Sequence, residues 1–183
     1  MSQTKPYYKQ LVTLLDGRKA AIRPICVEDK SQVKAFHNRL SDETRFLRYH
    51  YCKGGLTEDD LKAYCEIDYY NDMALVAEIV HEEGSGIIGV GRFCRLPNFN
   101  TAEIAFVVQD GEQRKGVGTQ LLKHLALLAW ERNIRYFHTE VLRHNRRMLS
   151  IFRKSDPDLN EEVDSSSTCI VTMSVLATIN NTP

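Results

Sequence analysis

A polar loop with two glycines stands between an apolar run and a helical pattern. The loop is Gln113-Arg114-Lys115-Gly116-Val117-Gly118, and residues 104–108 before it are all apolar, as is typical of a strand buried on both faces. The first N–H groups of a helix have no intrahelical partner, and its dipole favours an anion there. The glycines would let the backbone approach a phosphate, and Arg114 and Lys115 add positive charge, so the loop predicts a diphosphate site. The helix is indicated by apolar residues that recur at helical spacing: Leu121, Leu122, Leu125, Leu128 and Ala129.

Two other phosphate-binding motifs do not fit this loop. A P-loop requires Gly-Lys followed by Ser or Thr, whereas Lys115 precedes Gly116 here. A dinucleotide-binding fingerprint requires a third glycine three residues after the second, and that position is Leu121. Glycine content alone favours an ordinary strand-to-helix connection, which stays open as the alternative.

The pattern Gln-x-x-Gly-x-Gly after a strand and before a helix resembles the acetyl-CoA motif of the GNAT superfamily of N-acetyltransferases. Residues 103–106, Glu-Ile-Ala-Phe, resemble the strand that carries the catalytic glutamate in histone-type members. Further segments resemble the acetyltransferase domain of bacterial Pat-type protein lysine acetyltransferases, and together the matches cover roughly residues 10–155. These segments are Arg23-Pro24-Ile25 with Glu28-Asp29, and residues 45–49, 67–69 and 73–77.

The resemblance implies an enzyme that moves an acetyl group from acetyl-CoA directly to a primary amine. A protein lysine is the favoured acceptor, and the chain is expected to be a monomer or a homodimer. Two alternatives stay open: an N-acetyltransferase for small-molecule amines, and a non-catalytic acyl-CoA-binding module. The implied fold is α/β (α+β), with a mixed, mostly antiparallel sheet, a V-shaped split between two central parallel strands, and helices on both faces.

Glu103 is the general base that the resemblance implies. A lysine amine is mostly protonated at pH 7, so acyl transfer requires removal of a proton. The apolar neighbours Ala102, Ile104 and Ala105 predict that the Glu103 carboxylate is desolvated and its pKa raised. The residues alone favour an alternative, a partly exposed glutamate at a strand end in a salt bridge.

The resemblance also assigns the coenzyme contacts. The N–H groups of Val107 or Val108 would stabilise the oxyanion if the central strand splays from its parallel neighbour, and regular pairing is the alternative. Asn145 would contact the pantetheine arm, act as a helix N-cap, or do both. The diphosphate would bind Gln113, Arg114, Lys115, Gly116, Val117, Gly118 and Thr119.

Two positions depart from the family pattern. Phe152 stands where many relatives have a tyrosine that acts as general acid for the departing thiolate, so that role is vacant here. Ser155-Asp156 replaces the usual Gly-Phe after this helix. Both departures make the non-catalytic alternative plausible.

Composition narrows the remaining classes. The 183 residues suffice for one domain with a core, and Lys plus Arg equals Asp plus Glu at 24 each, which gives no reason to expect nucleic acid or membrane binding. With no long apolar stretch, no signal peptide and five scattered cysteines, the chain is expected in the cytoplasm without disulfides. His138, Glu140 and His144 are too weak a pattern for a metal site, so none is predicted.

The remaining patterns give the predicted element order. Residues 10–179 are expected to form one domain between a flexible start (1–9) and a tail (180–183), with a hairpin at Asp16-Gly17. The strand after the central helix should run parallel to the central strand. Predicted helices are 28–40, 41–48, 57–67 and 144–154; predicted strands are 10–15, 19–23, 73–80, 87–96, 136–142 and 168–176, with turns at 82–86 and 97–100 and a polar turn region at 155–167.

Overall fold

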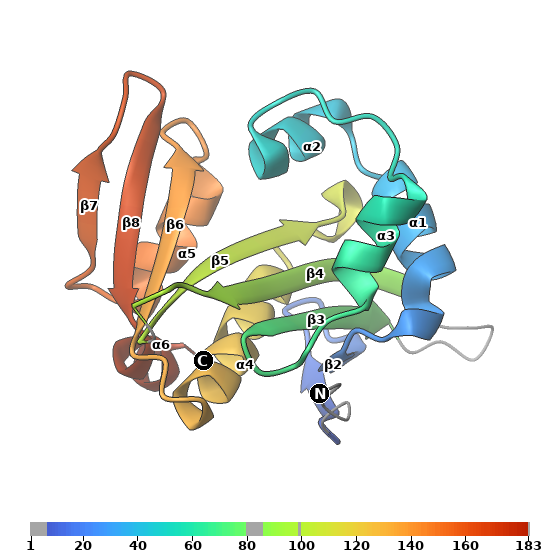
Figure 1. The fold of residues 1–183 in the computed structure, drawn as a ribbon, viewed down its shortest axis with the longest axis horizontal. Coiled ribbons are helices and arrows are strands. Elements are labelled where there is room, and N and C mark those ends of the chain that lie inside the picture. The colour runs from blue at the N-terminus through green and yellow to red at the C-terminus, as the bar shows by residue number, and fades with distance from the viewer. Residues whose placement is uncertain (1–6, 80–85, 99, 183) are drawn as a thin grey trace.

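The computed structural model describes residues 7–79, 86–98 and 100–182, which form one mixed sheet with helices on both faces (Figure 1). The strand order is β1-β2-β3-β4-β5-β6-β8-β7, and β5–β6 is the parallel pair among the described strands. The strands are β1 (Gln10–Thr13), β2 (Lys19–Pro24), β3 (Asp72–Ile79), β4 (Gly86–Arg95), β5 (Thr101–Val108), β6 (Tyr136–Leu142), β7 (Asn160–Val163) and β8 (Thr168–Ser174). The helices are α1 (Lys30–Asn38), α2 (Asp42–Tyr49), α3 (Glu58–Cys65), α4 (Val117–Glu131), α5 (Arg146–Ser155) and α6 (Val175–Asn181), with short 3-10 turns η1 (Val27–Asp29) and η2 (Asp110–Glu112).

Helix α4 packs against one face of the sheet, and helices α1 and α3 pack against the other. The apolar stripe predicted for α4 is confirmed, since Leu121, Leu122 and Leu125 are fully buried against the strands. On the opposite face, residues such as Phe36 and Leu61 form a second apolar cluster with β3. These two layers cover β3 and β4 on both faces.

The local signals at the N-terminal half are largely confirmed. The hairpin at Asp16-Gly17 forms, with Gly17 at φ +85°, a backbone conformation that favours glycine. The α2 cap is Ser41, whose hydroxyl accepts the Thr44 N–H. The capping box at Thr57 opens α3. The flexible start at 1–9 falls mostly outside the described residues, as do the turn at 82–86 apart from its last residue and one position of the turn at 97–100.

The prediction that the central strand is buried on both faces is wrong. Ala102, Ile104 and Phe106 are buried, but the side chains between them are less covered: Glu103 is exposed, and Ala105 and Val107 are half-buried. Ala105 and Val107 on the less covered face line a cavity. The apolar run in the sequence is therefore continuous although only one face of the strand is fully buried.

The parallel pair separates after a short contact. Residues Thr101–Glu103 of β5 pair with Tyr136–His138 of β6, and β6 then continues along β8. The remainder of β5 pairs only with β4 among the described strands. The V-shaped split predicted from the family resemblance is therefore present.

The C-terminal part contains two elements that the sequence analysis missed. β7 lies within the region 155–167, which was predicted as a polar turn region. Its four residues are all exposed, so no alternating apolar pattern marks it as a strand. The last strand was predicted to reach residue 176, but it ends at Ser174, which caps α6 by accepting the Ala177 N–H at 3.3 Å. α6 includes Asn180 and Asn181, which were expected in the tail.

A buried ion cluster links β2 to η1 and β3. The Arg23 guanidinium donates to Asp29 at 2.7 and 2.9 Å and to Glu78 at 3.1 Å, and the three side chains are at most 16% exposed. Burial opposes the charge on Asp29, but hydrogen bonds from Arg23 and Cys26 outweigh it and lower the pKa of this carboxyl. The charged cluster therefore forms part of the fold at neutral pH.

Substituting Arg23→Met is expected to lower the free energy of unfolding by about 3–5 kcal/mol at pH 7, because two buried carboxylates lose their ion pair with the guanidinium. A carboxyl whose pKa is lowered in the fold stabilises it above its unfolded-state pKa, and this contribution is lost as the pH falls through the folded value. The difference between the wild type and the variant should therefore shrink as the pH falls below about 4. Urea unfolding at pH 7 and below about pH 4 measures the free energies of unfolding of the two proteins. A loss below about 1 kcal/mol at pH 7 in the variant would contradict the role of the cluster.

Candidate functional site

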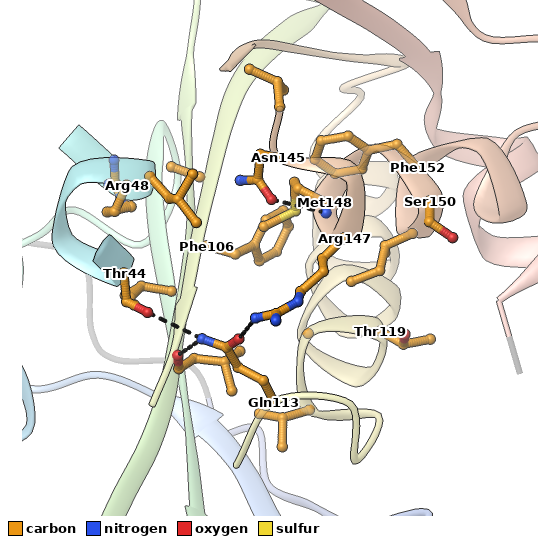
Figure 2. A pocket seen from close by; sticks show the side chains of 18 of the residues that line it. Thr44, Arg48, Phe106, Gln113, Thr119, Asn145, Arg147, Met148, Ser150 and Phe152 are labelled. Atoms are coloured by element: carbon orange, nitrogen blue, oxygen red, sulfur yellow. Dashed lines mark hydrogen bonds between the residues drawn. The ribbon is translucent and has the colours of Figure 1, made fainter. Parts of the chain in front are cut away.

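A cavity of about 710 Å³ opens where β5 and β6 separate. This is the size range of small-molecule sites. Its walls come from β5, β6, the loop before α4, the first turn of α4, and helices α5 and α2 (Figure 2). The predicted site residues other than Lys115 line it: Glu103, Val107, Val108, Gln113, Arg114, Gly116, Val117, Gly118, Thr119 and Asn145.

The loop before α4 has the conformation that a phosphate cradle requires. Gly116 is the N-cap of α4 and has φ +87°, where a side chain would be strained. Its carbonyl accepts the first intrahelical bond, from the Gln120 N–H at 2.9 Å. The N–H groups of Val117, Gly118 and Thr119 therefore precede the helical ladder and are available to an anion. These amides border the cavity, so the cradle fits a diphosphate.

The two positive side chains predicted at the cradle, Arg114 and Lys115, lie in different places. The Lys115 ammonium lies 3.3 Å from a Glu112 carboxylate oxygen and 3.8 Å from one of Asp16, and Lys115 does not line the cavity. Arg114 lines it, as predicted, and Arg147 on α5 lines it from the opposite side. Arg147 was missed because its position depends on how α5 packs against the loop, and no local pattern signals that packing.

The side chain of Gln113 is occupied by contacts within the protein. Its amide nitrogen donates to the Thr44 hydroxyl and to the Val108 carbonyl, each at 3.2 Å, and its oxygen accepts from Arg147 (Figure 2). Gln113 therefore connects α2, the end of β5 and α5 across the loop end of the cavity. Its backbone remains part of the predicted diphosphate loop.

The register of β5 decides which amides face the split. The Gln109 N–H donates to the Ile88 carbonyl of the β4 side, and Val107 is paired with Val90. Because N–H groups alternate sides along a strand, Val107 also points to β4, whereas Val108 points into the split. The Val108 carbonyl faces the same way, since it accepts from Gln113. Of the two predicted oxyanion donors, Val108 is the one that the register favours.

Glu103 lies at the narrow end of the split, where the parallel pairing stops. It stands opposite Cys94 on β4 and His138 on β6, so these three side chains share one face of the sheet. The desolvation predicted for Glu103 is wrong, because its side chain is exposed at the edge of the cavity. The exposure leaves the carboxylate open to an incoming amine or to water.

Asn145 caps α5, and its side chain lies at the cavity. Its oxygen accepts the Met148 N–H at 3.2 Å, as an N-cap does (Figure 2). The capping alternative considered for Asn145 is therefore confirmed. The capping bond engages the side-chain oxygen, so a pantetheine contact by the amide nitrogen is compatible with it.

The two departures from the family pattern have structural roles. Phe152 is 1% exposed and packs against Phe106, with ring centroids 6.3 Å apart. Ser155 and Asp156 are buried, and Asp156 accepts the Ser174 N–H at 2.7 Å. These residues fix the end of α5 to the start of α6 and contribute no acid to the cavity.

The family resemblance places one wall of the acceptor cleft in the helical region that includes α2, but no side chain of this helix was given a chemical role from the sequence. Arg48, Tyr49 and His50 line the cavity on the side facing Glu103 and β6. His50 has φ +61° and caps the helix, and its Nδ1 lies 3.9 Å from the Glu140 carboxylate across the cavity. Helix α2 therefore extends from the loop before α4 to the β6 side of the split.

The described residues contain no group of three or more His, Cys, Asp and Glu side chains arranged to hold a metal ion. His138, weighed earlier as a ligand, instead lies 3.3 Å from the Thr172 hydroxyl. Among the helices of the described ranges, none has the length and apolar character to cross a membrane.

Comparisons with known proteins agree with this geometry. The model of the acetyltransferase (GNAT) family matches residues 35–155. An acetyltransferase of Pseudomonas aeruginosa is 32% identical over 161 residues, covering 82% of this chain and 84% of that protein. The crystal structure of the GNAT domain of S. lividans PAT has a TM-score of 0.85 at 28% identity and covers 94% of this chain and 99% of its own. The structure of Salmonella typhimurium yncA with its cofactor acetyl-CoA has a TM-score of 0.65 at 16% identity, covers 85% of this chain and 92% of its own, and shows a shared fold alone.

Proposed function

We propose the following reaction for this chain, which belongs to the acetyltransferase (GNAT) family: acetyl-CoA gives its acetyl group directly to a primary amine, and the favoured acceptor is a lysine of another protein. Acetyl transfer itself follows from the family. The observation that carries the finer proposal is that the diphosphate-type loop and Glu103 line one cavity.

The loop end of the cavity suits the donor. The free amides at the start of α4, together with Arg114 and Arg147, supply donors and positive charge for a diphosphate. The unpaired edge of β5 beside the split suits an extended pantetheine arm, which would bond to it as a strand does. We therefore assign this end of the cavity to acetyl-CoA.

The reaction needs a base, an oxyanion donor and a leaving group. In the proposed step, the amine nitrogen attacks the thioester carbonyl carbon, and its proton passes to the Glu103 carboxylate directly or through water. The carbonyl oxygen becomes anionic, and the Val108 N–H is positioned to stabilise it. The carbon–sulfur bond then breaks, and the CoA thiolate leaves as a weak base without an acid at position 152.

Direct transfer is favoured over an acetyl-cysteine intermediate by the state of the Cys94 thiol. Cys94 lies opposite Glu103 on the neighbouring strand. Burial raises the pKa of the Cys94 thiol to about 11, although the Arg92 charge opposes this. A protonated thiol is a poor nucleophile at neutral pH, which supports attack by the amine itself.

The lysine acceptor is supported by the similarity to the GNAT domain of S. lividans PAT. Release of free thiol from acetyl-CoA, measured with lysine-bearing proteins and with a panel of free amines, tests it. We expect protein acceptors to support faster release. Release with amino acids or polyamines alone would make the chain a small-molecule enzyme, and tight acetyl-CoA binding without release on any acceptor would indicate a binding module.

Two further points stay proposals. Residues 10–179 are proposed to act as one acetyltransferase domain, since the cavity is lined by residues that range from Leu15 to Lys154. A cytoplasmic location remains a prediction from the cysteine pattern.

A further inference from the structure

Helix α2 depends on polar contacts for its position. Of its eight residues, all described, Thr44 is the only buried one. An element with few buried apolar contacts opens at low free-energy cost unless other bonds hold it. Tyr49 near its C-terminal end accepts from the Tyr64 hydroxyl at 3.3 Å, and the bonds of its N-terminal turn tie the helix to the loop after β5.

Asp110, on the loop that follows β5, holds this turn. One carboxylate oxygen accepts from the Ser41 hydroxyl at 2.6 Å and the Thr44 hydroxyl at 2.7 Å, and the other accepts the Ser41 N–H at 2.9 Å. Burial opposes the charge, but these hydrogen bonds outweigh it and lower the pKa of Asp110. A carboxylate at a helix N-terminus is also favoured by the helix dipole.

Gln113 makes the second connection. Its amide nitrogen donates to the Thr44 hydroxyl, while its oxygen accepts from Arg147 (Figure 2). Thr44 thus joins both connections, because its hydroxyl donates to Asp110 and accepts from Gln113. The chain of bonds runs from the diphosphate loop to α2 without an intervening apolar contact.

The other end of α2 forms a wall of the acceptor side. Arg48, Tyr49 and His50 line the cavity there, and His50 lies 3.9 Å from Glu140 of β6. We propose that Asp110, Thr44 and Gln113 are positioning residues that couple occupancy of the coenzyme loop to the placement of α2. This inference rests on the proposed binding of acetyl-CoA.

The expected coupling has a physical cause. A coenzyme diphosphate is a stronger acceptor for Arg147 than a neutral amide, so binding draws Arg147 toward the phosphates. Binding also restricts the loop that carries Asp110 and Gln113, and α2 is bonded to that loop. Coupling between two sites is reciprocal and typically 5–150-fold, so donor binding should order the acceptor wall by a measurable amount.

Hydrogen exchange of the full chain with and without CoA tests this, with residues 42–50 as the readout. In the wild type, CoA should slow exchange there by at least about fivefold. Thr44→Val keeps the bulk but removes the hydroxyl, so it should raise basal exchange and reduce the effect of CoA to less than about twofold. Thr44→Ser keeps the hydroxyl and should retain the wild-type response. Asp110→Asn, which cannot accept all three bonds, should behave like Thr44→Val.

The possible results distinguish a merely structural role of these contacts from coupling, and both from a failure of CoA binding. If Thr44→Val and Asp110→Asn raise basal exchange but CoA still slows exchange as in the wild type, the contacts are merely structural and the coupling is overturned. CoA binding by calorimetry without any change at residues 42–50 of the wild type overturns the coupling alone. Absence of CoA binding overturns the proposed function, and the coupling with it.

Discussion

Glu103→Gln is expected to lower the turnover number for acetyl transfer by about 10²- to 10⁴-fold, because general-base catalysis typically contributes that much. Glutamine has the same shape but cannot take a proton from the amine. The affinity for CoA should change by less than about threefold, since the coenzyme loop lies at the other end of the cavity. Steady-state thiol release and calorimetry measure the two quantities separately.

The matched control is Glu162→Gln, the same chemical change on exposed strand β7, outside the cavity lining. Its turnover should stay within about threefold of the wild type, as for surface substitutions. Equal losses of turnover and CoA affinity in Glu103→Gln would contradict the base role. So would a turnover within threefold of the wild type across the pH range.

Gly116→Val is expected to weaken CoA binding by about five- to thirtyfold, since a left-handed conformation costs a side chain about 1–2 kcal/mol and each 1.4 kcal/mol is tenfold. Gly116 has φ +87°, and an added Cβ would lie 3.4 Å from Leu15. The loop must move to relieve this strain, and its amides then lose their alignment toward the diphosphate. Calorimetric titration with CoA measures the change.

Gly111→Ala provides the comparison, because a Cβ at Gly111 meets nothing within 4 Å and φ there is not positive. Its CoA affinity should match that of the wild type. Far-UV circular dichroism establishes that both variants are folded. A folded Gly116→Val variant with wild-type affinity would remove the loop from the binding site.

The parts of the fold that local chemistry determines were predictable from the sequence. The loop and α4 follow from Gly116, Gly118 and a helical apolar period, and the comparisons confirm the family resemblance drawn from that motif. β7 was not predictable, because an exposed edge strand has no apolar alternation. The strand-to-helix change at Ser174 was missed because a serine cap after apolar residues gives a weak local signal.

The site shows the same division. Glu103 and the loop could be named from a motif, whereas the exposure of Glu103 depends on where β6 turns away. The contacts of Gln113 join residues far apart in the chain, 69 positions from Thr44 and 34 from Arg147. Such contacts depend on how distant elements pack together, so no periodicity or spacing in the sequence predicts them.

A crystal structure with acetyl-CoA tests the central claim most directly. We predict that the diphosphate contacts the amides of Val117, Gly118 and Thr119, and that the thioester lies in the split between the Val108 N–H and Glu103. A diphosphate bound away from the start of α4, or a thioester on the far side of the sheet from Glu103, would contradict the account.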